Sequence, residues 1–455
     1  MTGSLRIALA ALPFLALAAC APDDSSGSTT GDGPDDPKPT TCAAPTHGPT
    51  IHRGDVMGDE TWSADASPHV VEETVNVRNG ARLVIEPCAT VEMAEGKSLH
   101  VAFPITPNTG TLIAEGSEHA PIHFRGQDGA RWGRVLVQSP GTASLAWVTF
   151  EDGGGADSPS GATLVAEGDG ALPIRRDLAV DHVTIDGSLG AGVKVLRRAA
   201  FAKGSDALVV RGSGSPEHPY PIEIGEAAID GLPLGDYTSN AKDEILIAPE
   251  FSVEEDAEMR DVGVPYHLGD SPVDRLVVGH GRQGDPPATL TIEAGTTIRF
   301  DRETGFEIEH ATGTFAATGA LVAVGTAASP IVFESGADAP APGDWKGLWF
   351  GGVPAATDRI EHARIAHTGA DCGCILVSCC GNLEGYEGAV IFTQPPASPF
   401  VRDTEIAYAA SNAFVLGYDG VSMDFTESNT FTAVAGLHLV TPRDGSCPNP
   451  LPTCE

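Results

Sequence analysis

The chain has 455 residues, of which 62 are acidic and 27 are basic, giving a formal net charge of −35. This charge repels phosphate backbones and anionic lipid surfaces, so nucleic acid is not an expected partner. Aromatic residues make up only 6% of the chain and glycine is abundant, with 54 residues. A core must therefore be packed mainly by Val, Ile, Leu and Ala, which favours an all-β fold over a helical bundle.

Residues 1–19 have the features of a secretory signal peptide. Arg6 precedes an apolar run, Ile7 to Ala19, that is too short to span a bilayer. The run ends in Leu17-Ala-Ala-Cys20, which resembles the lipobox of bacterial lipoproteins. In that motif the cysteine is lipidated and becomes the mature N-terminus. The resemblance implies lipid attachment at Cys20, and Ala21 after it implies delivery to the outer membrane. A plain secretory signal with a chance cysteine is the alternative.

Residues 20–51 contain the lipidated cysteine and a stretch of Asp, Ser, Gly, Thr and Pro with hardly an apolar side chain. Such a segment cannot bury enough surface to offset its ordering entropy. We predict a disordered tether between the membrane and the folded part.

The rest of the chain is a tandem duplication of short strands closed by Gly or Pro. Apolar residues alternate with polar ones over 4 to 8 positions, as in half-buried strands. Four landmarks of copy one recur in the same order in copy two: 83–93, 111–116, 121–124 and 131–137 against 290–300, 319–325, 330–333 and 343–350. The offset grows from 197 residues (Pro68 to Pro265) to 221 (Val183 to Thr404), so copy two has gained residues in loops.

The duplication sets the expected domain boundaries. They are copy one at 52–213, a connecting segment rich in Pro, Gly and Asp at 214–242, copy two at 243–441, and a tail at 442–455. Residues 52–80 and 420–455 are expected to cover the open ends of the stacked strands.

These landmarks carry a resemblance. The strand-Glu-Ala/Pro-Gly-Thr segment, the Gly-Xaa-Leu…Pro-Ile-Val-Phe segment and the Gly-Asp-Trp-Xaa-Gly turn are similar to those of secreted, surface-anchored bacterial right-handed parallel β-helix proteins. Copy one departs from them at turns, for example with Cys88 where copy two has Gly295. The resemblance implies an internally duplicated right-handed parallel β-helix, a solenoid. The fold also carries polysaccharide lyases and hydrolases, so it does not decide function.

Eight cysteines remain besides Cys20, and an even number in an exported chain favours disulfides. We expect Cys42 to bridge Cys88, and Cys447 to bridge Cys454 and close the tail. Four more lie in a loop insertion of copy two and should form two bridges, although a tetrahedral zinc site is the alternative. These four are Cys372, Cys374, Cys379 and Cys380.

Other polar residues give weaker signals. Acidic residues near turns could join a calcium site or an acid and base pair, or be solvated turn carboxylates: Asp152, Asp157, Asp186 and Asp403. His362 and His367 should face opposite sides of a strand, which argues against a shared metal, and His310 is a third histidine of copy two. A uronate lyase needs cations, but its only candidates, Arg175-Arg176 and Arg197-Arg198, are not expected to stack. No cofactor is expected beyond possible calcium.

Trp345 and Trp349 are candidates for stacking on sugar rings. However, Trp345 recurs as Trp132 at the same turn of copy one, which is typical of a packing element. Neither copy offers a catalytic set, and the copies retain turn and core residues while their charged residues diverge.

The sequence therefore favours an outer-membrane lipoprotein, on its periplasmic face or at the cell surface. We expect a binding, adhesion or scaffold role towards a polysaccharide or a surface protein. A polysaccharide lyase or hydrolase and an inert spacer are the alternatives.

Overall fold

The computed structural model describes residues 42–103, 108–269, 275–282, 284–308, 316–370, 387–418 and 420–441, which belong to one compact unit. The signal peptide, Cys20, His310 and all cysteines except Cys42 and Cys88 lie outside these residues. Within them the regular structure comprises 36 strands and three short 3₁₀ helices, with no α-helix. No helix in these ranges is long and apolar enough to cross a membrane. The prediction of an all-β fold is confirmed.

The strands form four sheets, in which every pairing between named strands is parallel. The 13-stranded sheet contains β4 (Val75–Val77), β7 (Leu99–Val101), β10 (Val135–Gln138), β12 (Leu164–Glu167), β14 (Val193–Leu196), β17 (Ile222–Ile224), β19 (Ile245–Ile247), β21 (Tyr266–Leu268), β24 (Thr297–Phe300), β27 (Ile331–Ser335), β30 (Ala363–Ala366), β33 (Glu405–Ala407) and β35 (Thr430–Thr432). The 12-stranded sheet contains β1 (Thr50–His52), β2 (Glu60–Trp62), β3 (His69–Val71), β5 (Ala81–Ile85), β6 (Thr90–Met93), β8 (Gly110–Glu115), β9 (Ile122–Gly126), β11 (Thr142–Glu151), β13 (Arg175–Asp186), β15 (Ala199–Phe201), β16 (Asp206–Arg211) and β18 (Gly235–Asp236).

Copy two supplies the two smaller sheets. The five-stranded sheet contains β20 (Ala257–Met259), β23 (Ala288–Ile292), β26 (Gly319–Val324), β29 (Arg359–Glu361) and β32 (Val401–Arg402). The six-stranded sheet contains β22 (Arg275–Val278), β25 (Gly305–Ile308), β28 (Leu348–Phe350), β31 (Gly388–Phe392), β34 (Asn412–Leu416) and β36 (Leu439–Val440). The 3₁₀ helices are η1 (Ala64–Ala66), η2 (Gln127–Gly129) and η3 (Glu226–Ala228).

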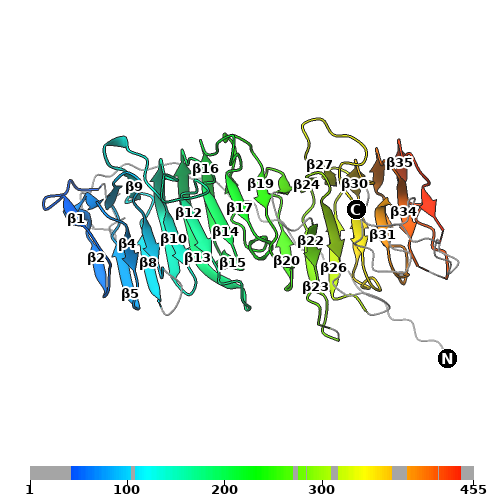
Figure 1. The fold of residues 1–455 in the computed structure, drawn as a ribbon, viewed down its shortest axis with the longest axis horizontal. Helices are drawn as coiled ribbons and strands as arrows, with labels where there is room; N and C mark the ends of the chain where they lie inside the picture. The colour runs from blue at the N-terminus through cyan, green and yellow to red at the C-terminus, as the bar shows by residue number, and fades with distance from the viewer. Residues whose placement is uncertain are drawn as a thin grey trace, which may run out of the picture. The chain divides into compact units, whose positions relative to one another are not determined.

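A typical coil of the chain contributes three strands, one to each face. Thus β5, β6 and β7 make one coil, and β8, β9 and β10 lie on them in the next, since β5 pairs with β8, β6 with β9 and β7 with β10. Successive strands on every face are parallel and are joined through the other two faces (Figure 1). This architecture is a parallel β-helix.

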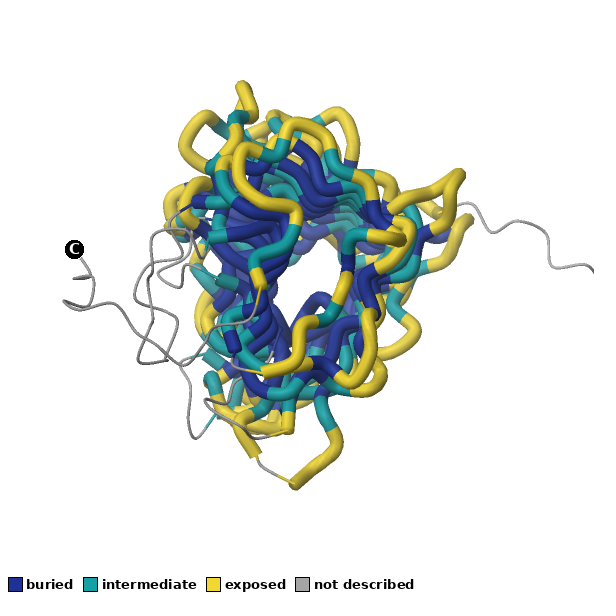
Figure 2. The backbone as a smooth tube through the Cα atoms, turned by 90° about the vertical axis from the view of Figure 1, so that its right-hand side faces the viewer, coloured by how far each residue is buried: buried dark blue, intermediate teal, exposed yellow. Residues whose placement is uncertain are grey.

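The inside of the coils is the core. Along β5 the side chains of Ala81, Leu83 and Ile85 are buried while Arg82 is exposed, as the period-two pattern predicts. Figure 2, which views the coils end on, shows the buried residues nearest the axis and the exposed residues in the turns. One continuous apolar cluster runs from Val56 to Phe425, so each coil buries its inner side chains against both neighbours.

The two copies are rotated against each other by one strand position. Equivalent strands of the copies lie in different sheets: β9 is in the 12-stranded sheet but its counterpart β27 is in the 13-stranded sheet, and β10 is in the 13-stranded sheet but its counterpart β28 is in the six-stranded sheet. The 13-stranded sheet therefore joins the third strands of the coils in copy one to the second strands in copy two. The segment 214–242 makes this change as a folded coil with β17, η3 and β18.

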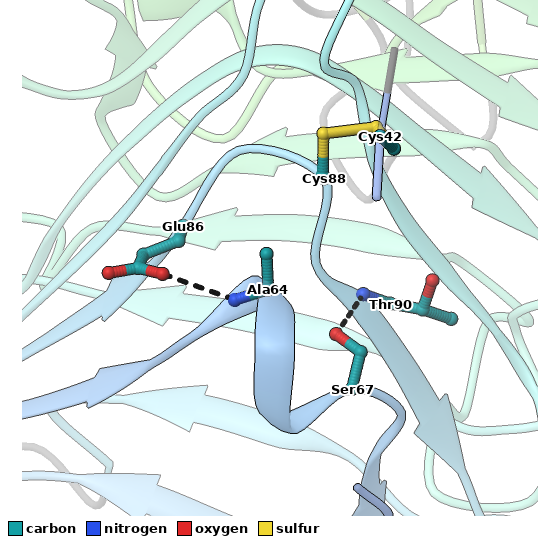
Figure 3. The surroundings of a disulfide bond; sticks show 6 residues. All are labelled: Cys42, Ala64, Ser67, Glu86, Cys88 and Thr90. Atoms are coloured by element: carbon teal, nitrogen blue, oxygen red, sulfur yellow. Dashed lines mark hydrogen bonds between the residues drawn. A yellow bond between two sulfur atoms is a disulfide. The ribbon is translucent and has the colours of Figure 1, made fainter. Parts of the chain in front are cut away.

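The folded body starts earlier than the expected boundary at residue 52. Cys42 is bridged to Cys88, which lies in the turn between β5 and β6 (Figure 3), and β1 pairs with β3. In the same region Glu86 accepts a hydrogen bond from the backbone N–H of Ala64 (3.1 Å). Residues 42–51, which the sequence assigned to the tether, are thus tied to the first coils.

Candidate functional site

The rotation creates a junction, which we define as residues 199–268, from β15 to β21. Only the 13-stranded sheet crosses it without a break, through β14, β17, β19 and β21. The 12-stranded sheet ends at β18 and the five-stranded sheet begins at β20, with no strand pairing between β18 and β20 in the described part of the chain. The junction is therefore a place where two sheets have open edges within the stack.

Side chains cap the open edge of β20. The Asp230 carboxylate accepts a hydrogen bond from the backbone N–H of Glu258 at 3.4 Å. The Arg260 guanidinium donates to the carbonyl of Leu232. Since unpaired backbone groups are costly away from water, these contacts replace part of the missing strand.

Arginines from copy one hold the first residues of copy two. Arg176 pairs with Asp230 at 3.3 Å and with Glu255 at 3.6 Å. Arg198 pairs with Glu254 at 2.8 Å and lies over the ring of Phe251, 4.3 Å from its centroid. These arginines are engaged by carboxylates of the chain, so they are not free cations for an anionic sugar.

A buried carboxylate supports the same segment. Glu226 is 2% exposed, and its Oε2 accepts hydrogen bonds from the backbone N–H groups of Glu250 (3.0 Å) and Phe251 (3.2 Å). Burial raises the pKa of Glu226, although the two N–H donors oppose that rise. The side chain acts as a structural acceptor beneath the segment 250–255.

An open hollow of about 470 Å³ lies on the first two strands of the five-stranded sheet. Its polar walls come from outward side chains of β20 and β23 and from the coil before them; they are Asp230, Asp256, Glu258, Thr289 and Thr291. Asp256 is held by the backbone N–H of Thr289 (2.9 Å), and Glu258 stands in register with Thr291. Carboxylate acceptors and hydroxyl groups in an open hollow suit a ligand that donates many hydrogen bonds, such as a neutral sugar.

On the 13-stranded sheet the junction carries a buried charged cluster. His267, 1% exposed, lies 2.7 Å from Glu244 Oε2 through Nδ1 and 2.9 Å from Asp301 Oδ1 through Nε2. Burial alone would lower the pKa of His267, but the hydrogen bonds with Asp301 and Glu244 raise it above its ordinary value. Burial alone would raise the pKa of Glu244, but hydrogen bonds from His267, Arg299 and Lys242 lower it to about 2. The cluster joins three successive coils.

The carboxylates singled out from the sequence are not gathered into one site. Asp152 lies 3.6 Å from Arg131, Asp186 pairs with Arg211 at 2.9 Å, and Asp157 lies 3.4 Å from His100 Nε2. Asp403 is on the other copy. Across the residues that the structure describes, there is no group of three or more His, Cys, Asp or Glu side chains that could hold a metal ion.

The two candidate tryptophans have different surroundings. Trp345 is fully buried, stacks on Phe300 with centroids 3.9 Å apart, and donates from Nε1 to the carbonyl of Ala366 (2.7 Å). It is a packing element and offers no face to a sugar. Trp349 faces outward and is partly buried beside Ile391 and Val415, which are almost fully buried.

Of the three histidines singled out from the sequence, His362 and His367 are described, and they occupy successive bends on either side of β30. Both have left-handed backbone, with φ of 50° at His362 and 66° at His367. His367 stacks on Tyr408, with centroids 5.5 Å apart.

The other two candidate arginines, Arg175 and Arg197, also contact acceptors of the chain, as Arg176 and Arg198 do. Arg175 pairs with Asp177, and Arg197 donates to the carbonyl of Gly168.

The residues of the hollow were missed from the sequence. They belong to the segment without a repeat and to the outward faces of β20 and β23, where the landmarks give no signal. Only the abundance of Asp and Glu between 226 and 258 could have pointed to this region.

Comparison with known proteins agrees with the fold. Residues 283–370, within copy two, match the family described as pectate-lyase like beta helix domain. No curated protein and no solved structure matches the chain.

Proposed function

We propose that this chain is an outer-membrane lipoprotein whose β-helix is a binding module for neutral carbohydrate chains at the cell surface. The open hollow at the junction carries the proposal, because it combines three carboxylates with two threonine hydroxyls and is open to solvent among the residues that the structure describes. The family match supports a carbohydrate-related or structural role for the β-helix.

The charge of the hollow selects between classes of glycan. A uronate chain would bring further negative charge beside Asp230, Asp256 and Glu258, which are already part of a chain with net charge −35. Arg176, which lines a smaller pocket that shares Asp230 and Asp256 with the hollow, is paired with Asp230 and Glu255. Neutral sugars can donate hydroxyl hydrogen bonds to the carboxylates without this repulsion.

Binding and turnover are to be measured on the same protein. We expect saturable binding of neutral oligosaccharides on a glycan array, with no reducing sugar or unsaturated uronate released. Thr291→Trp, which fills the hollow from an outward position of β23, should abolish binding. Thr430→Trp is the matched control, since Thr430 is an exposed threonine of β35, on the 13-stranded sheet and away from the hollow. Turnover would favour the hydrolase or lyase, and neither signal would favour an inert spacer.

The anchor has its own test. Mass spectrometry of the mature protein should show a lipid-modified cysteine at position 20, and Cys20→Ala should release a soluble form. Lipidation at two acyl chains or more gives stable attachment, so wild-type protein that stays in the aqueous phase without detergent would contradict the proposal.

A further inference from the structure

Copy one has a row of single-residue bends along one edge of the coils. The long strands β11 and β13 each turn from one face to the next at one residue, Trp147 with φ of 51° and His182 with φ of 52°. Ala207, with φ of 52°, makes the same turn in the next coil. Strand register places these three residues next to one another, because Val148, Val183 and Leu208 are paired in sequence. Left-handed backbone is unfavourable for such residues and is often found at functional positions.

The rings of the first two bends form a stack. The Trp147 and His182 ring centroids are 3.9 Å apart with an interplanar angle of 9°. Because the residues belong to adjacent coils, their ring faces point along the direction in which the coils are stacked. Trp147 covers one face of His182, and the opposite face points towards the coil that carries Ala207.

Ala207 leaves a gap beyond that face. Leu234 follows it in register, since Leu208 pairs with Gly235, and Leu234 is 41% exposed. Neighbouring coils are about 4.8 Å apart, so His182 and Leu234 are separated by roughly 9.6 Å. Apolar contacts form at about 3.5–4 Å, which leaves room for one ring between His182 and Leu234, above the methyl group of Ala207.

Two carboxylates flank the gap. Asp181 and Asp206 are paired in register in the row next to the bends, and both are exposed. Asp181 Oδ1 lies 2.8 Å from His182 Nδ1. Within the described ranges neither carboxylate forms an ion pair with Lys or Arg, unlike Asp186 on the same strand, which pairs with Arg211.

We infer that the Ala207 gap is a subsite for one uncharged pyranose ring of the bound glycan. The apolar face of the ring lies on the His182 imidazole, with Leu234 on its other side. Its hydroxyls donate to the Asp181 and Asp206 carboxylates, which repel uronates. The subsite rests on the proposed carbohydrate-binding function. Leu234, which borders it, lies four residues after Asp230 of the hollow.

The equivalent edge of copy two lacks these features. The row that corresponds to the flanking carboxylates is Val324, Glu361 and Arg402, in which Glu361 pairs with Arg402 at 3.5 Å and with Arg359 at 2.9 Å. The bends there are His362 and Asp403. The next coil carries Ser428, whose carbonyl accepts the N–H of Asp403. Copy two therefore supplies a control at the same kind of position.

The test compares a tryptophan placed in the gap with a tryptophan placed at the equivalent position of copy two. Ala207→Trp should fill the gap, and Trp147 shows that tryptophan fits this row with the same φ. Ser428→Trp is the matched control on copy two. Binding of cellohexaose, mannohexaose and hexagalacturonate is measured by titration calorimetry on the full-length protein, with thermal unfolding of each variant as the check on folding.

We expect the wild type to bind a neutral hexasaccharide, Ala207→Trp to weaken that binding at least tenfold, and Ser428→Trp to leave it within twofold. Asp181→Asn with Asp206→Asn should weaken binding and reduce the discrimination against hexagalacturonate, and this pair serves as the test if Ala207→Trp does not fold. Binding that survives in both variants, or preference of the wild type for hexagalacturonate, would overturn the subsite. No binding of any neutral glycan by the wild type would overturn the proposed function itself.

Discussion

The two copies agree on the inside of the coils and differ on the outside. Leu112 and Ala114 of β8 are buried, as are their counterparts Leu321 and Ala323 of β26. One residue further, the exposed Glu115 of copy one corresponds to Val324 of copy two. The duplication has thus kept the residues that fill the coils and has varied the residues that meet solvent.

The bends show the same divergence with a sharper contrast. At the first two bends copy one has the stacked Trp147 and His182, while copy two has His362 and Asp403 at the corresponding places. All four residues keep a φ close to 50°. The backbone geometry is thus shared, and the chemistry displayed on it is particular to each copy.

The largest expected effect tests the core packing that the two copies share. Trp132 and Trp345 occupy the same turn in the two copies, are fully buried, and donate from Nε1 to the carbonyls of Glu151 (2.6 Å) and Ala366 (2.7 Å). Trp132→Ala and Trp345→Ala should each lower the free energy of unfolding by about 3–5 kcal/mol. Urea unfolding followed by circular dichroism measures both. A loss below about 1 kcal/mol in only one variant would show that the copies do not share this packing.

The second prediction concerns the disulfide that copy one has at its β5–β6 turn and copy two lacks at the equivalent position. The Cys42–Cys88 bridge closes a separation of 46 residues, whereas Gly295 stands at the position of Cys88 in copy two. Replacing both cysteines by serine should cost about 2–4 kcal/mol, because the unfolded chain gains freedom. Hydrogen exchange should show the loss in β1, β3 and β6 and not in copy two. Equal loss of protection in both copies would contradict a local role for the bridge.

The buried residues of the coils could be predicted from the sequence better than the exposed residues. Inner residues repeat with a period of two and recur in both copies, so β23, β24 and β27 could be predicted from residues 290–300 and 330–333. The rotation between the copies could not be predicted, because it is made in the segment 214–242, where no landmark repeats. Trp147 and His182 were missed because their contact depends on the register of two coils, which the loop lengths conceal.

The third prediction concerns the junction, where the two copies meet. His267→Gln removes the imidazolium from between Glu244 and Asp301, and leaves Glu244, 5% exposed, with fewer partners. Asp301 is partly exposed and keeps its hydration. We therefore expect the free energy of unfolding to fall by about 3 kcal/mol, the lower end of the range for breaking a buried ion pair. Lys194→Gln, which affects the 2.7 Å pair with Glu223 on the same sheet, is the control and should cost less.

The same cluster fixes the direction of a pH dependence. The raised pKa of His267 contributes stability that is complete below its ordinary value of 6.5 and is lost as pH rises through the folded-state pKa. The lowered pKa of Glu244 contributes stability that is present above its ordinary value of 4.5 and is lost as pH falls towards about 2. Stability should thus be highest between these limits. His267→Gln should flatten the alkaline side, and it should also weaken the acid side, because His267 is one of the hydrogen-bond donors that lower the pKa of Glu244. If stability falls as steeply with rising pH in the variant as in the wild type, groups other than His267 cause that fall.

The smallest expected effect tests the outside of the two copies directly. A double-mutant cycle with Trp147→Ala and His182→Ala should give a coupling of about 0.5–1.5 kcal/mol, as for other stacked rings. The corresponding cycle with His362→Ala and Asp403→Ala should give less, because no ring stack joins this pair. Both cycles place alanine at left-handed positions, so the cost of the backbone cancels within each cycle. If the couplings are equal, the stack contributes nothing of its own, and the difference between the copies must then be sought in Asp181 and Asp206.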